Sequence, residues 1–85
     1  MLDKATNQII DNIVACRKNA GMSQADVTIK LQQLGFNYGH GRLSMIETKR
    51  RPPSAALILA LKLIFKCEYA DFYKGVETDF SKLLK

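Results

Sequence analysis

Residues 21–53, GMSQADVTIKLQQLGFNYGHGRLSMIETKRRPP, contain two short helical patterns separated by a glycine-bearing turn. Ser23 and Asp26 have the spacing of a capping box, in which a hydroxyl and a carboxylate each accept a backbone N–H at the start of a helix. Apolar residues then recur at three- and four-residue spacing. Gly35 follows them, and glycine readily takes the left-handed conformation that ends many helices. The pattern predicts a helix over about 24–34.

The second half of this stretch predicts another helix, over about 38–48. Asn37 is a candidate N-cap, and Leu43 with Ile46 would give the helix one apolar side. The turn over 35–41 contains three glycines. Two of them would weaken the first helical turn by roughly 1 kcal/mol each. This weakness indicates either a backbone that approaches another molecule closely or a loose loop end.

Helical patterns also lie on both sides of this stretch. We expect helices over about 3–20, 55–66 and 68–73, and a weakly amphipathic tail over 76–85. Apolar residues make up 47% of the 85 residues, and no strand-like alternation extends for long. The chain therefore predicts an all-α, compact five-helix domain over 1–75, followed by a short tail that can be helical and contact a dimer partner.

Several functional classes are disfavoured by what the sequence lacks. No run approaches the roughly 18 apolar residues of a membrane span, and the N-terminus has no signal-peptide pattern, so we expect a cytoplasmic protein without membrane contact. Cys16 and Cys67 lack metal-ligand spacing and are interpreted as buried free thiols. His40 is the only histidine and has no catalytic partners in the pattern. We expect no enzyme activity, no metal and no cofactor.

The positive charge is concentrated around the two-helix motif. The chain carries a formal net charge of +5, and residues 17–51 contain seven basic and two acidic residues. Such a field favours a polyanionic partner, although a merely solvated basic surface is the alternative. A helix, a turn and a helix with basic edges have the shape that enters a DNA major groove. The coincidence of charge and motif favours double-stranded DNA.

Taken together, these features resemble the phage repressor/Cro family, also called the Xre-type helix-turn-helix family of bacterial transcriptional regulators. The resemblance covers about residues 9–73 and rests on Arg17, Gly21-Met22-Ser23-Gln24, Val27, Leu31, Gly35, Leu43-Ser44, Ile46-Glu47 and Arg51-Pro52. The segment between Gln24 and Glu47 is longer than in short phage repressors. The resemblance implies a lambda-repressor-like fold, with helices two and three at about 23–48. It also implies a bacterial or phage-encoded regulator, most simply a repressor, that binds DNA sequence-specifically.

The resemblance assigns DNA contacts to individual residues. The recognition helix, about 38–48, would read bases through Tyr38, His40, Gly41, Arg42 and Met45. Among these, arginine can bind the O6/N7 edge of guanine with two hydrogen bonds, and methionine can contact a thymine methyl. Phosphate contacts are expected from Gln24, Ser44, Lys49, Arg50 and Arg51. These contacts would position the protein and make binding salt-sensitive without reading sequence.

Arg17 and Glu47 correspond to a family pair that joins helix one to the end of helix three. Arg17 lies on the apolar stripe of the first helix, where an unpaired charge would be unfavourable, so we expect an internal ion pair in preference to two surface charges. Replacing Glu47 by Ala should lower the unfolding midpoint.

The family resemblance also implies a homodimer, with DNA half-sites about one helical turn apart. The candidate dimer contacts are Ile58, Leu63, Tyr69, Tyr73, Phe80 and Leu84. The alternative is that these residues only complete a small core. A protein-interaction module on the same fold, either an antitoxin or an adaptor with a protein partner, is the alternative function. The basic residues Arg42 and 49–51 favour DNA, because a purely protein-binding module has no need of them.

Overall fold

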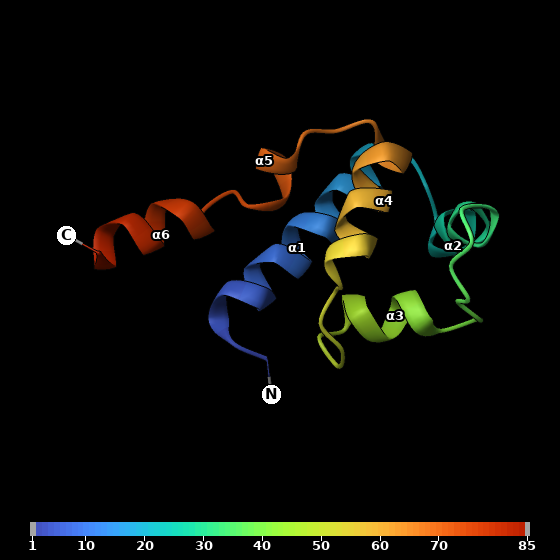
Figure 1. The fold of residues 1–85 in the computed structure, drawn as a ribbon, viewed down its shortest axis with the longest axis horizontal. Helices are drawn as coiled ribbons and strands as arrows, with labels where there is room; N and C mark the ends of the chain where they lie inside the picture. Colours follow the sequence, from blue (N-terminus) through green and yellow to red (C-terminus); the bar gives the residue numbers. More distant parts are fainter. Residues whose placement is uncertain (1, 85) are drawn as a thin grey trace.

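Six α-helices make up the regular structure of residues 2–84, the part of the chain that the computed structural model describes (Figure 1). They are α1 (Lys4–Asn19), α2 (Gln24–Gln33), α3 (Arg42–Glu47), α4 (Ala55–Phe65), α5 (Tyr69–Phe72) and α6 (Val76–Leu83). No β-strand occurs within these residues, so the all-α prediction is confirmed. The predicted five helices become six because the tail forms α6.

Helix α1 is the central element and contacts α3, α4, α5 and α6. Its start is capped by Asp3, whose carboxylate accepts the backbone N–H of Thr6 at 2.7 Å. Ile10 and Ile13 are fully buried on its inner side. They belong to one apolar core, whose other buried members are Val27, Leu31, Leu43, Ile46, Leu57, Ile58, Ala60, Leu61, Phe65 and Phe72. Every helix except α6 contributes to this core.

Helix α2 forms as the capping box predicts. The Ser23 hydroxyl accepts the backbone N–H of Asp26 at 3.0 Å, and the Asp26 carboxylate accepts the backbone N–H of Ser23 at 2.9 Å. The helix ends where Gly35 takes a φ of +96°. The backbone N–H of Phe36 then bonds back to the Leu31 carbonyl at 3.0 Å, which closes the last turn of α2.

Helix α3 is shorter than predicted: it begins at Arg42 rather than near residue 38. Gly41 is its N-cap with a φ of +88°, a left-handed conformation that residues with a Cβ rarely adopt. Asn37 therefore does not cap this helix. The reason lies in Tyr38, whose ring packs edge-on against Phe36 with centroids 5.4 Å apart. This contact holds the preceding segment against the core in a loop.

The C-terminal half attaches to α1 through one polar anchor. The Asn12 side-chain amide donates to the Phe72 carbonyl at 2.8 Å and to the Lys74 carbonyl at 3.0 Å. Helix α6 then extends beyond this anchor to the end of the molecule opposite α2 (Figure 1). Only Val76 of α6 is buried. None of the helices in residues 2–84 has the length and apolar character needed to cross a membrane.

Candidate nucleic-acid interface

Arg17 and Glu47 form a bidentate ion pair between α1 and α3. Arg17 Nε lies 2.7 Å from Glu47 Oε2, and Arg17 Nη2 lies 2.9 Å from Oε1. The two side chains are 12% and 6% exposed. Parallel N–H···O bonds of this kind fix direction as well as distance. The C-terminal end of α3 is therefore held in one orientation on α1.

Two further hydrogen bonds bring α2 into the same network. The Gln24 side-chain amide donates to Glu47 Oε1 at 2.9 Å, and Arg17 Nη1 donates to the Met22 carbonyl at 2.9 Å. The phosphate contact predicted for Gln24 stays a prediction, and in the structure its amide orients Glu47. Its nitrogen carries a second hydrogen that can still donate to an anion. The separation of 23 residues between Gln24 and Glu47 gave no sequence signal for this contact.

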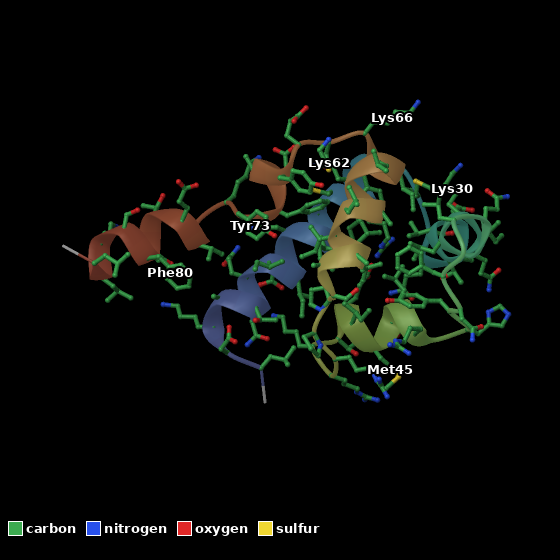
Figure 2. All side chains as sticks on the ribbon, viewed as in Figure 1. Lys30, Met45, Lys62, Lys66, Tyr73 and Phe80 are labelled. Atoms are coloured by element: carbon green, nitrogen blue, oxygen red, sulfur yellow. The ribbon has the colours of Figure 1, made fainter. Side chains whose placement is uncertain are left out.

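The outward side of α3 presents Arg42 and Met45. Leu43 and Ile46 point into the core and are 2% and 1% exposed, whereas Met45 is 36% exposed. Figure 2 shows Met45 at the edge of the molecule, directed away from α1 and α4. The Arg42 guanidinium lies 4.9 Å from the centre of the Tyr38 ring, and Arg42 as a whole is exposed. This cation–π contact holds the arginine at the start of α3.

The other predicted base-contacting residues lie in the loop before α3, not on a helix. Tyr38 is half-buried against the core, and its carbonyl accepts the Gln32 side-chain amide at 2.6 Å. His40 is exposed, and Gly41, which has no side chain, can contact DNA only through its backbone. A role for Tyr38 is therefore better described as supporting Arg42 than as reading a base.

The predicted phosphate contacts surround the C-terminal end of α3. Lys49, Arg50 and Arg51 are exposed, and Ser44 is half-buried. Lys49 has a φ of +67°, so the chain reverses there, and the Arg50 backbone N–H bonds to the Met45 carbonyl at 2.9 Å. Lys49 Nζ also lies 3.0 Å from Asp11 Oδ1. That pair is solvent-exposed and contributes little stability, so the lysine can exchange it for a phosphate.

The charge on this surface is therefore almost entirely positive. Between Arg42 and Arg51 the only acidic residue is Glu47, and its carboxylate points inward to Arg17. Arg42, Lys49, Arg50 and Arg51 remain on the outside. We call these four residues, together with Met45, the α3 surface. A polyanion approaching it meets four cations, one of which, Lys49, is paired with the exposed carboxylate of Asp11.

The six predicted dimer contacts do not form one patch, but three of them, Tyr73, Phe80 and Leu84, line one hollow between α1 and the C-terminal helices. Ile58 is only 9% exposed and belongs to the core, so its assignment to a dimer surface is wrong. Tyr69 lies under the Lys62 ammonium at 5.2 Å, and Tyr73 is half-buried. Leu63 lies on α4, whereas Phe80 and Leu84 lie on and just after α6, at the other end of the molecule.

The two cysteines of the chain lie beside each other. Cys16 and Cys67 are half-buried, and burial raises the pKa of both thiols; that of Cys67 rises to about 11, with the neighbouring Cys16 adding to the shift. Protonated thiols are poor nucleophiles and poor metal ligands. No group of three or more potential metal ligands occurs within residues 2–84.

Comparison with known proteins assigns this chain to no group. Neither a family model, nor a curated protein, nor a solved structure matches it. Its function therefore has to be inferred from its own side chains and their arrangement.

Proposed function

We propose that this protein binds double-stranded DNA sequence-specifically and acts as a transcriptional regulator, most simply as a repressor that blocks a promoter by occupancy. In this proposal its fold is of the lambda-repressor type. Helix α3 is the recognition helix, and α2 crosses the DNA backbone above it. The observation that carries the proposal is the α3 surface, which combines exposed cations with a helix that a buried ion pair holds in place.

The roles of the residues follow from their positions. Arg42 is the base reader, because its exposed guanidinium can donate two hydrogen bonds to guanine and the Tyr38 ring restricts its motion. Met45 is placed for apolar contact with a thymine methyl. Arg50 and Arg51 bind phosphates on one side of α3, and Gln24 contributes from α2. Ser44 and His40 are minor contacts.

The rigidity of this arrangement matters for affinity. Positioning long side chains at an interface requires about 0.5–1.5 kcal/mol of ordering free energy for each. The Arg17–Glu47–Gln24 network fixes the backbone of α2 and α3 before DNA arrives. Because a single half-site supports only weak binding, two copies on adjacent half-sites are part of the proposal.

A protein-interaction module on the same fold is the alternative, and it predicts apolar docking surfaces rather than cations. Exposed Leu63, Phe80 and Leu84 are compatible with it. It leaves the α3 surface without a purpose, however, whereas DNA binding uses that surface and does not exclude a protein partner.

Selection of bound sites from a random double-stranded DNA pool tests the proposal. The wild-type chain should enrich a common sequence at low salt. Arg42→Ala should weaken binding to that sequence by about 1–3 kcal/mol while leaving non-specific binding nearly unchanged. Lys82→Ala, which removes the same charge from α6, is the matched control and should behave as wild type. Failure of the wild type to retain any DNA at low salt would rule the proposal out.

A further inference from the structure

Helix α6 projects from the molecule with an uncovered apolar stripe. Phe80, Leu83 and Leu84 are 51%, 80% and 87% exposed. Their spacing from the buried Val76 places all four on one side of a helix. Hollows on either side of Phe80 separate α6 from α1, with Ser81 and Leu84 lining one of them and Leu83 the other. We call residues 76–84 the α6 arm.

Acidic residues border this stripe on both sides. Glu77 lies beside the hollow that contains Leu84, and Asp79 lies beside the hollow that contains Leu83. At 100° per residue the two carboxylates fall on opposite edges of the stripe, with Lys82 on the back of the helix. The arm is therefore an apolar ridge with a negative charge along each margin.

A groove with basic rather than acidic margins lies between the C-terminal ends of α2 and α4. It has a volume of about 260 Å³ and is lined by Lys30, Gln33, Leu34, Leu63, Ile64 and Lys66. Leu34 and Leu63 are 55% and 59% exposed, so their apolar surface is open to solvent. Figure 2 shows Lys30 and Lys66 at the end of the molecule opposite Phe80, and on the side away from Met45. We call these six residues the α2/α4 groove.

The charges of both surfaces form no close ion pair within the described chain, although Lys4 lines the hollow beside Asp79 and Lys30 lies near enough to lower the pKa of the Asp26 carboxyl. Among residues 2–84, neither Glu77 nor Asp79 of the arm forms an ion pair, and neither Lys30 nor Lys66 of the groove does. An arm packed against another arm would bring carboxylates together, and two facing grooves would bring lysines together. Both arrangements are repulsive, whereas an arm in a groove pairs opposite charges around an apolar contact.

A chain cannot fill its own groove. An eight-residue helix is about 12 Å long, whereas the molecule measures 43 Å along its longest axis, with the arm and the groove at opposite ends. We infer that the α6 arm of one chain docks into the α2/α4 groove of a second copy. Two copies lying side by side and antiparallel can exchange both arms, which doubles the buried contact and closes the assembly.

This self-association does not require DNA, because neither the arm nor the groove includes a residue of the α3 surface. In this arrangement Leu63 lies in the groove, whereas Phe80 and Leu84 lie on the arm. Leu63 contributes to the receiving surface, and the other two enter it.

Charge reversal tests the inference with sedimentation velocity at low salt. The wild type should associate at concentrations of about 100 µM or below, as expected for a small contact. The groove variant Lys30→Glu/Lys66→Glu and the arm variant Glu77→Lys/Asp79→Lys should each weaken self-association by at least about tenfold. A 1:1 mixture of the two variants should restore association, because each arm then faces a groove of opposite charge.

Circular dichroism checks that both variants keep the helical content of the wild type. If a reversal unfolds the chain, Lys30→Gln/Lys66→Gln and Glu77→Gln/Asp79→Gln replace it and should weaken association and remove its salt dependence. A wild type that stays monomeric at about 1 mM overturns the inference, since even a millimolar dissociation constant would then populate the dimer. So do reversed variants that associate like the wild type, or a mixture that fails to restore association.

Discussion

The two ends of this molecule are built in opposite ways. At one end, α1, α2 and α3 meet around the Arg17–Glu47 pair, whose side chains are 12% and 6% exposed, and these helices bury Ile13 and Val27 completely. At the other end the α6 arm has one buried residue, Val76, and apolar side chains that are 51–87% exposed.

One end therefore carries a surface on a fixed helix, and the other carries apolar side chains that no part of the described chain covers. The α3 surface is exposed but fixed from behind, so a rigid ligand such as duplex DNA can meet it without reorganisation. The α6 arm presents an apolar stripe, and contact with another surface would stabilise it by removing that stripe from water. Substitutions at the two ends should therefore differ in their effect on the free energy of unfolding.

The largest expected effect comes from comparing two phenylalanines. Phe72, the last residue of α5, is fully buried, whereas Phe80 on the arm is 51% exposed. Phe72→Ala should lower the free energy of unfolding by about 3–5 kcal/mol because it leaves a cavity. Phe80→Ala should lower it by less than about 1 kcal/mol in the dilute monomer. Urea denaturation of both variants measures this, and equal losses would show that the arm is packed as firmly as the core.

Glu47→Ala should have the next largest effect. It leaves the Arg17 guanidinium unpaired in a site that is 12% exposed. Removing one member of a buried pair lowers the free energy of unfolding by 3–5 kcal/mol. We expect about 3 kcal/mol because Arg17 still donates to the Met22 carbonyl.

The matched control is Asp11→Ala, which breaks the exposed pair with Lys49 and should change the free energy of unfolding by less than about 1 kcal/mol. Chemical denaturation midpoints compare the two variants directly. A Glu47→Ala midpoint as little changed as that of Asp11→Ala would mean that the ion pair does not fix α3.

The smallest effect concerns the thiols between the two ends and appears only in alkali. Burial raises the pKa of Cys67 from an ordinary 9.0 to about 11. As pH rises, the unfolded chain loses this proton first, so the stabilisation is full below pH 9 and declines between about pH 9 and 11. Cys67→Ala should flatten this decline in unfolding experiments at a series of pH values. An identical pH dependence in the two proteins would contradict the shift.

Sequence pattern predicted the parts of the fold that depend on local chemistry. The Ser23 cap, the apolar stripes of α1 and α2 and the position of α4 all follow from spacing along the chain. The Arg17–Glu47 pair was expected from family resemblance and from the cost of a charge on an apolar stripe. Each of these features depends on particular residue types at a particular spacing, which the sequence shows directly.

The features that the sequence pattern does not predict depend on side-chain packing and backbone conformation, which residue spacing does not show. The pattern predicts a start of α3 that is four residues too early, because periodicity cannot show that Tyr38 packs on Phe36 or that Gly41 adopts a left-handed backbone. The bond from Gln24 to Glu47 is equally invisible in the pattern. Helix α4 is apolar on several sides, so its pattern does not tell which apolar residues face the core. The structure shows that Ile58 is buried and that Leu63 is exposed.

The salt dependence of DNA affinity tests the central claim most directly. Fluorescence anisotropy on a selected duplex should give a linear fall of log affinity with log salt for the wild type. Arg50→Ala/Arg51→Ala should reduce that slope by about 1.8, two phosphate contacts at about 0.9 each. Lys62→Ala/Lys82→Ala, which removes equal charge away from the α3 surface, should leave the slope unchanged. Equal slopes for all three proteins, or no binding by the wild type at low salt, would contradict DNA recognition by α3.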